Sequence, residues 1–237
     1  MPTLAMIHTV SWYGQSVIEP FARRWLEDNP DVRAINLMDD SLLSESLDHG
    51  GPTDAVIQRM AHYIEAAVLT GADVIMSTCT TMGAATERAR KKCPVPLFNI
   101  DEPMAREAVR MGTRLGILAT VPTSAPATRR LLEREAAALG KTVQIETVID
   151  EPAFASLLAA DRAEHDRLVH AGMDQLAARV DVIVLGQISL AQIQHQPGVP
   201  VLQVGHSGFT HARNLLNEVE ADDGKAPLAS RPRRVDI

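Results

Sequence analysis

One cysteine stands where a strand-like run ends and a helical pattern begins. Cys79 follows the apolar run 74–77 and precedes the helical stretch 81–92. Unsatisfied backbone amides and the positive dipole end at a helix start lower the pKa of a thiol and favour the thiolate. The alternative is a small buried hydrophobic side chain, which is the commoner fate of a free cysteine. The hydroxyl-rich surroundings, Ser77-Thr78-Cys79-Thr80-Thr81, favour a functional thiol because a purely structural site needs no such cluster.

The same pattern occurs a second time without its cysteine. The stretch 73–79 ends in Cys79, and 108 positions later the stretch 181–187 repeats the apolar run and ends in Gln187. Two further pairs of runs match in the same order, 4–10 with 115–121 and 95–100 with 199–204. Three matches in register predict two similar lobes rather than a solenoid, whose units are about 20 to 50 residues long.

Strands and helices alternate along the chain. Short aliphatic or β-branched runs predict strands at 4–9, 32–37, 74–77, 97–100, 115–119, 143–148, 182–185 and 201–204. Helical patterns lie between them at 17–28, 54–70, 81–92, 103–111, 125–139, 163–179 and 209–220. This alternation predicts an α/β fold of two pseudo-symmetric lobes, each a parallel sheet flanked by helices.

The lobe boundaries follow from the repeat. We expect a first lobe over 1–105 that contains Cys79, and a second lobe over 106–206 that contains Gln187. The last helix, 207–220, is expected to pack back on the first lobe. The segment 221–237, with its glycine, prolines and late arginines, is typical of a solvated tail.

Four short loops follow strand ends, where ligands bind in open α/β sheets. They span 9–15, 78–83, 120–124 and 186–190. If the lobes face each other, these loops converge on one cleft, which we expect to be the active site. Thr9, in the first of them, is expected to contact the substrate.

Polar residues at the other strand ends extend this site. Thr120, Thr123 and Ser124 suit a carboxylate or phosphate, although capping a helix uses the same geometry. His206 follows a strand-like run and is either a second acid or base or a solvated helix-start residue. His8 ends the first run and is interpreted as a satisfied core histidine or a further cleft residue.

Composition excludes several classes of protein. The 237 residues carry a net charge of −7, which argues against nucleic acid as a partner because phosphate binding needs a basic stripe. There is no apolar run of about 18 residues, so no membrane span is expected. Metal-ligand spacings and glycine-rich phosphate fingerprints are missing, and we expect neither a metal nor a nucleotide. Without a secretory signal the chain is interpreted as cytoplasmic, with Cys93 a structural thiol.

The repeat and two motifs resemble the aspartate/glutamate/hydantoin racemase superfamily over nearly all the chain up to the tail. The motifs are Ser77-Thr78-Cys79-Thr80-Thr81-Met82-Gly83 and Leu115-Gly116-Ile117-Leu118-Ala119-Thr120. The resemblance implies two lobes that each supply one cysteine beside a small carboxylate substrate, and no cofactor. One thiolate removes the α-proton, and the opposing thiol returns a proton to the other face. Assembly into a homo-oligomer is left open.

The resemblance assigns roles position by position. It makes Cys79 the first family cysteine and implies carboxylate contacts at Thr80, Thr81, Thr120 and Thr123. The second cysteine, expected after Gly186, is replaced by Gln187. A glutamine amide can form hydrogen bonds, but it has no accessible proton to exchange.

Three hypotheses follow from one thiol and one amide. The first is a cofactor-independent isomerase or decarboxylase of a small carboxylate, with Cys79 as acid/base or nucleophile. The family includes arylmalonate decarboxylases and maleate isomerases, but those decarboxylases keep the other cysteine. The second is an amino-acid or hydantoin racemase with a different second base, His206 being the first candidate. The third is a small-acid binding protein without catalysis.

Overall fold

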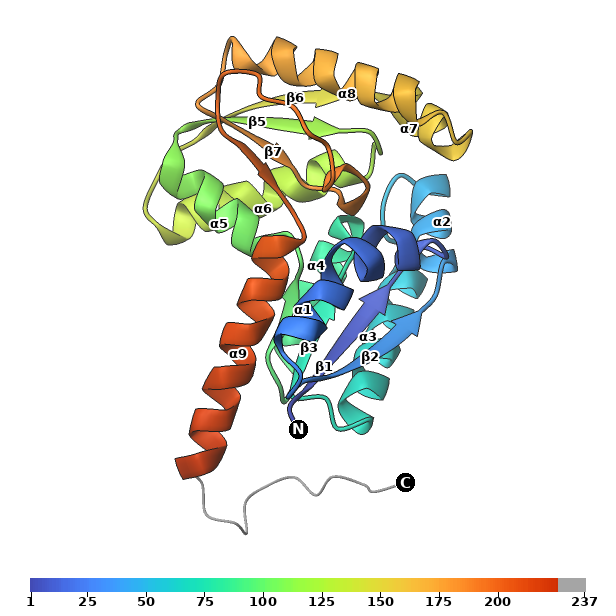
Figure 1. The fold of residues 1–237 in the computed structure, drawn as a ribbon, viewed down its shortest axis with the longest axis vertical. Helices are drawn as coiled ribbons and strands as arrows, with labels where there is room; N and C mark the ends of the chain where they lie inside the picture. Colours follow the sequence, from blue (N-terminus) through green and yellow to red (C-terminus); the bar gives the residue numbers. More distant parts are fainter. Residues whose placement is uncertain (226–237) are drawn as a thin grey trace. The chain divides into compact units, whose positions relative to one another are not determined.

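The chain folds into two compact α/β units. The computed structural model describes residues 1–225 (Figure 1). The first unit comprises residues 1–100 together with the last helix from Gly208 onward, and the second comprises residues 101–207. Among the described residues no helix is long and apolar enough to cross a membrane.

The first unit has four parallel strands in the order β2-β1-β3-β4. The strands are β1 (Thr3–His8), β2 (Arg33–Met38), β3 (Val74–Ser77) and β4 (Leu97–Asn99). Its helical segments are η1 (Gly14–Ala22), α1 (Arg23–Asp28), α2 (Ser41–Asp48), α3 (Asp54–Leu69), η2 (Thr80–Met82), α4 (Gly83–Arg90) and α9 (His206–Lys225). The first two residues of α9 belong to the second unit.

The second unit repeats this topology with the order β6-β5-β7-β8. The strands are β5 (Arg114–Ala119), β6 (Gln144–Ile149), β7 (Val182–Leu185) and β8 (Val201–Gln203). Its helical segments are α5 (Glu102–Met111), α6 (Ser124–Ala138), α7 (Glu151–Leu158), α8 (Arg162–Ala177) and η3 (Ile188–Leu190). The identical strand order confirms the predicted fold of two parallel sheets flanked by helices.

One aspartate plays the same part in both copies of the repeat. Asp73 accepts a hydrogen bond from the backbone amide of Thr3 at 2.7 Å. Its counterpart Asp181 accepts from the amides of Thr113 and Arg114 at 3.1 and 2.8 Å. Asp73 and Asp181 directly precede β3 and β7. Their carboxylates therefore link these strands to the starts of β1 and β5.

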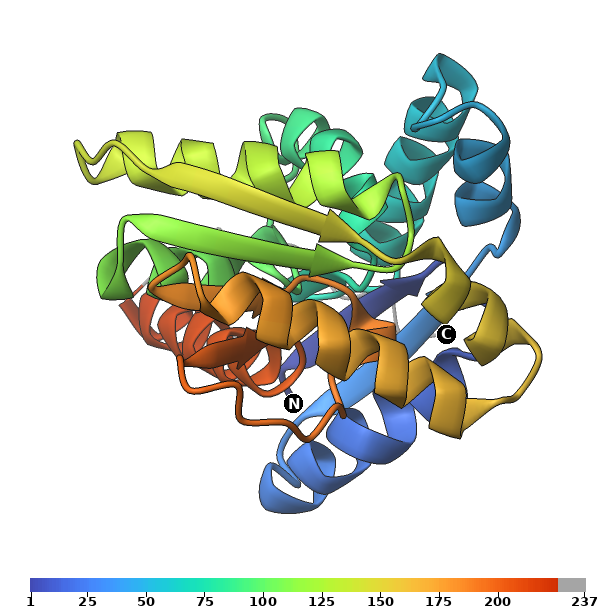
Figure 2. The same cartoon turned by 90° about the horizontal axis from the view of Figure 1, so that it is seen from above.

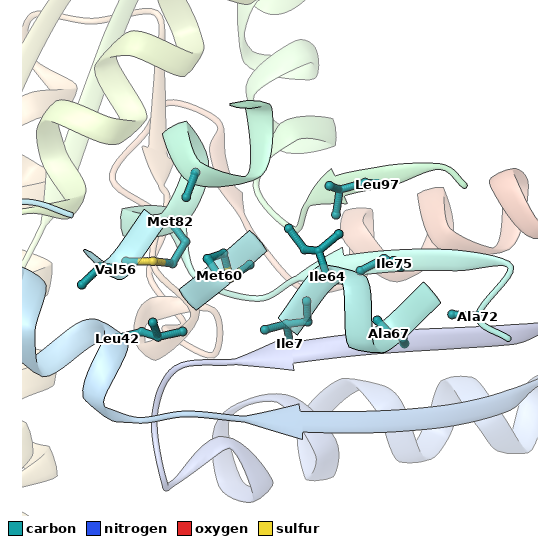
Figure 3. Close-up of a cluster of buried hydrophobic side chains, with 12 residues drawn as sticks. Ile7, Leu42, Val56, Met60, Ile64, Ala67, Ala72, Ile75, Met82 and Leu97 are labelled. Atoms are coloured by element: carbon teal, nitrogen blue, oxygen red, sulfur yellow. The ribbon is translucent and has the colours of Figure 1, made fainter. Parts of the chain in front are cut away.

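The first sheet is covered on both faces. On one face, Ile7 and Ile75 pack against Met60 and Ile64 of α3, and Met82 of η2 joins the same cluster (Figure 3). On the other face, Phe209 of α9 stacks on Phe21 with ring centroids 6.4 Å apart. This double cover explains why β1 and β3 are buried along their whole length.

The second sheet is enclosed in the same way. Helices α8 and α6 lie on opposite sides of β5 and β6 (Figure 2). Gly172 lets α8 approach β5 closely, because an added Cβ would lie 2.8 Å from Cδ1 of Leu118. The edge strand β6 contains only exposed and half-buried residues, whereas the central strand β7 is buried throughout.

The structure differs from the predicted elements at several places. Helices α2 and α7 were not predicted, and η1 is a π-helix with Pro20 inside it where an α-helix was expected. Helix α9 continues to Lys225, so the predicted tail does not begin at residue 221. Neither Ala221 nor Asp222 breaks a helix in the way that a proline does, so α9 continues through both residues. The rest of the predicted tail, 226–237, lies outside the described residues.

Candidate functional site

Each sheet has a point where its strand order reverses, and the predicted site residues follow those strands. In the first unit the reversal lies between β1 and β3, which end at His8 and Ser77. In the second unit it lies between β5 and β7, which end at Ala119 and Leu185. Ligands of open α/β sheets bind beyond the carboxyl ends of strands at such points.

In the first unit, Cys79 is held by its main chain. It has an extended backbone, with φ −125° and ψ 116°, and it immediately precedes η2 and α4. Its carbonyl oxygen accepts hydrogen bonds from the amide of Met82 and from Nδ2 of Asn99, each at 3.1 Å. Cys79 is partly exposed, whereas Thr80 and Thr81 are buried. The strand end therefore fixes the backbone of a cysteine that is only partly buried.

The other cysteine lies at the opposite end of α4. Cys93 follows α4, and like Cys79 it is partly buried and packs against the apolar cluster between the sheet and α3. Burial raises the pKa of the Cys93 thiol, and a hydrogen bond from the backbone of Val95 only partly opposes this. Both cysteines are thiols rather than partners in a disulfide. Burial therefore disfavours the thiolate form of Cys93.

A buried histidine supports the residue that precedes Cys79. Nδ1 of His8 lies 3.0 Å from Oγ1 of Thr78, and Nε2 lies 2.9 Å from Oδ1 of Asn36. The ring also stacks on Tyr13 with centroids 4.3 Å apart. Burial lowers the pKa of His8 to about 4, although the hydrogen bond to Asn36 opposes the shift. Of the two interpretations of His8, the structure favours the satisfied core histidine, neutral near pH 7.

Asn36 and Asn99 are site residues that the sequence interpretation missed. Each interrupts or ends an apolar run, Asn36 in β2 and Asn99 at the end of β4. A single amide in such a strand is a usable signal, because a buried polar group needs a hydrogen-bond partner. Thr9, buried directly after β1, lies where the sequence places it.

In the second unit, Gln187 folds back onto the end of β5. Its Oε1 accepts hydrogen bonds from the amides of Thr120 and Val121 at 2.6 and 3.2 Å. Its Nε2 donates to Oγ1 of Thr120 at 3.3 Å. The Gln187 side chain is buried, and this arrangement joins the ends of β5 and β7.

The hydroxyl cluster after β5 lies at the start of α6. Thr123 is the N-cap residue of α6, but its side chain makes no capping hydrogen bond. The hydroxyl of Ser124 donates to the carbonyl oxygen of Val121 at 2.7 Å, which stabilises the turn itself. Of the two interpretations of these residues, capping by the Thr123 hydroxyl is therefore not realised.

His206, the candidate second base, is exposed and begins α9 directly after Gly205. Among residues 1–225, no group of three or more His, Cys, Asp or Glu side chains is arranged to hold a metal ion. The strand ends of the two units carry the Cys79 thiol, several hydroxyls, backbone amides and the carboxamides of Asn99 and Gln187.

Comparison with known proteins places this arrangement in context. A model of the Asp/Glu/Hydantoin racemase family matches residues 15–212. A glutamate racemase from Trichodesmium erythraeum (strain IMS101) is 32% identical over 74 residues, which make up 31% of this chain and 27% of that protein. The chain thus matches well under two thirds of that relative's length.

Two solved structures are similar in fold. A glutamate racemase isoform from Bacillus anthracis has a TM-score of 0.67 at 14% identity, covering 92% of this chain and 82% of that one. A liganded arylmalonate decarboxylase, in which one glycine is replaced by cysteine and one cysteine by serine, has a TM-score of 0.56 at 19% identity. The second match covers 91% of this chain and 93% of that one.

Proposed function

Because the chain belongs to the Asp/Glu/hydantoin racemase family, we propose that it is a cofactor-independent enzyme acting on a carbon centre next to the carboxylate of a small acid. Cys79 is the acid/base or nucleophile, and the reaction is an isomerisation or a decarboxylation. One solved structure of similar fold is an arylmalonate decarboxylase, which supports including decarboxylation in the proposal.

The observation that carries this proposal is the difference between two equivalent strand ends. The partly exposed thiol of Cys79 follows β3, whereas the buried carboxamide of Gln187 follows β7. Racemisation needs an acid or base for each face of the substrate, and an amide supplies neither. One thiol suits a reaction that exchanges a proton on one face only.

The residues around Cys79 suit a single proton transfer. In a decarboxylation, the C–C bond breaks, CO₂ leaves, and the electron pair remains on the substrate as an enediolate. The thiol of Cys79 then protonates the carbon, and the resulting thiolate regains its proton from water. The hydrogen bonds from Asn99 and Met82 to the Cys79 carbonyl hold the backbone from which the thiol projects. Hydroxyls of Thr80 and Thr81 are suited to hold the substrate carboxylate.

The test is a substrate screen in D₂O with NMR detection. Amino acids, hydantoins, malonates and maleate are incubated with the parent protein and with Cys79→Ser and Cys93→Ser. We expect the parent and Cys93→Ser to incorporate deuterium or convert the same compound, and Cys79→Ser to lose at least about 10²-fold in rate, as expected for a positioned acid or base. Equal activity of Cys79→Ser would overturn the role of Cys79. Saturable binding without turnover of any compound would identify a binding protein instead.

A further inference from the structure

We propose that Asn99 is the positioning residue of Cys79, which it holds through the main chain so that the thiol stays at the start of the following helix. The inference rests on the proposed function for the role of Cys79 in the reaction. Asn99, Cys79 and the turn η2 between Cys79 and α4 all lie in the first unit.

Asn99 connects the turn that carries Cys79 to a separate strand. The carbonyl oxygen of Cys79 accepts two hydrogen bonds of equal length, 3.1 Å, from the amide of Met82 and from Nδ2 of Asn99. Met82 belongs to η2 itself, so its hydrogen bond moves together with the turn. Asn99 is the last residue of β4. Of these two hydrogen bonds, the one from Asn99 therefore fixes the turn against the sheet.

The support from which Asn99 acts is rigid. Directly after Asn99, the amide of Ile100 donates to the carbonyl oxygen of Ser77 in β3 at 2.9 Å. The Asn99 side chain is buried, and its Oδ1 accepts a hydrogen bond from Oγ1 of Thr86 in α4 at 3.4 Å. The Cys79 carbonyl can only accept, which determines the end of the amide that faces it. A group on a rigid strand with a fixed rotamer is suited to precise positioning.

The repeat places a second carboxamide at the same position of the other unit. The matched runs 95–100 and 199–204 align Asn99 with Gln203. Asn99 is the last residue of β4, and Gln203 is the last residue of β8. Both side chains end in the same amide, and the glutamine is longer by one methylene group. The pair therefore compares the effect of side-chain length at equivalent strand ends.

The longer amide holds a different part of its turn. Gln203 donates from Nε2 to the carbonyl oxygens of Ile193 and Leu190, at 2.7 and 3.4 Å. These residues lie six and three positions after Gln187, the counterpart of Cys79. The glutamine thus reaches beyond the counterpart of the cysteine, whereas the shorter asparagine holds the cysteine itself. The length of Asn99 is therefore matched to Cys79.

The position of the turn controls how the thiol reacts. The dipole of a helix acts only within its first turn, so a thiolate is stabilised only while it stays at the helix start. Displacing a reacting group by about 1 Å can cost about 10²-fold in rate. Asn99 acts through the backbone of Cys79 rather than on the substrate. Its loss should therefore lower kcat and leave KM unchanged.

The first experiment measures the thiol without any turnover. Asn99→Gln keeps the amide but should reach past Cys79, as Gln203 reaches past its counterpart. Asn99→Ala removes the amide without adding volume. The folded proteins are alkylated with iodoacetamide near neutral pH, and Cys93 in the same molecule reports any general loosening of the fold. The ratio of the Cys79 rate to the Cys93 rate should fall about 5-fold in both variants, which corresponds to about 1 kcal/mol of lost stabilisation at the helix start.

A change of the same kind in the second unit provides the matched control. Gln203→Asn shortens the equivalent amide by one methylene group, and the ratio of labelling rates should equal that of the parent. With the compound that the substrate screen identifies, kcat of Asn99→Ala should fall at least about 10-fold at unchanged KM. A merely structural defect would instead raise the labelling of both cysteines together.

Three results would overturn the proposal. They are an unchanged ratio in the Asn99 variants, an equal fall in Gln203→Asn, or a parallel rise in the labelling of both cysteines. Should one Asn99 variant fail to fold, the other decides. Because labelling needs no substrate, its failure leaves the deuterium-exchange test of Cys79 intact. Equally, the ratio should fall in the Asn99 variants even if the screen detects no turnover.

Discussion

The neutral state of His8 gives the structure a specific dependence on pH. The side chain is completely buried, and its pKa is lowered from 6.5 to about 4. Between these two values the unfolded chain binds a proton at His8 and the folded protein does not. The free energy of unfolding must therefore rise with pH through this window and fall as the solution is acidified.

The magnitude follows from the size of the shift. Each pKa unit is worth about 1.4 kcal/mol, so the full contribution of His8 is about 3 kcal/mol. By the same linkage relation, about 2 kcal/mol of this is lost between about pH 7 and about pH 5. A loss of this size is a large fraction of the stability of a typical domain, which is about 5–15 kcal/mol.

The assay compares urea unfolding of three proteins at these two pH values. His8→Gln cannot titrate but keeps a donor and an acceptor for Thr78 and Asn36. His62→Gln removes an exposed histidine of α3 and is the matched control. The control should lose as much stability as the parent on acidification, and His8→Gln should lose about 2 kcal/mol less.

Comparing variants cancels the contribution of the acidic residues. A hydrogen bond from Arg167 lowers the pKa of Glu164, and the backbone amide of Arg114 lowers that of Asp181. Both groups destabilise every variant equally as the pH falls through their folded-state pKa values. If His8→Gln and the parent lose the same stability on acidification, His8 is not a neutral buried group. Its hydrogen bond to Thr78 as a neutral ring would then be refuted.

Two further predictions test the strand ends. Mass-mapped alkylation near neutral pH should modify Cys79 well before Cys93, because burial raises the pKa of the Cys93 thiol. Equal labelling of the two cysteines would contradict this expected difference in reactivity. Gly186→Ala should destabilise the protein by about 1–3 kcal/mol, the usual cost of overpacking, because the new Cβ would lie 2.5 Å from Oγ1 of the buried Thr128. Gly83→Ala is the control, because an added Cβ at that position meets only Nδ2 of Asn99, at 3.9 Å. The stabilities are measured by thermal unfolding. If both variants unfold at the temperature of the parent, the close approach at Gly186 is refuted.

The sequence predicted the strands well because their signal is local. All eight appear within about a residue or two of the predicted ranges, since buried parallel strands are short aliphatic runs whatever surrounds them. Helix α2 was missed because only Leu42 and Ser46 are buried in it, which leaves little apolar periodicity to detect. Helix α7 also lacks a buried apolar face, since Ala153 is its one buried residue. Its start is set by an N-cap, in which Asp150 accepts a hydrogen bond from the amide of Ala153.

The candidate site was predictable in position but not in its contacts. The repeat placed Cys79 and Gln187 at equivalent strand ends, and strand ends are where the topology collects ligand contacts. The hydrogen bonds from Thr120 and Val121 to Gln187 join residues more than 60 positions apart. Contacts of that kind depend on side-chain rotamers in the folded unit, which no local pattern encodes. The contact between His8 and Thr78, which are 70 positions apart, is a second example.

Single-sided proton delivery by Cys79 is tested most directly by the stereochemistry of the product formed in D₂O. With the compound that the substrate screen identifies, the parent protein should give one enantiomer carrying one solvent deuterium at the reacting carbon. Gln187→Cys, which restores a thiol at the equivalent strand end, should give both enantiomers. If the parent already exchanges the α-proton of both enantiomers of an amino acid, another residue is the second base, His206 being the first to examine, and the one-thiol account is wrong.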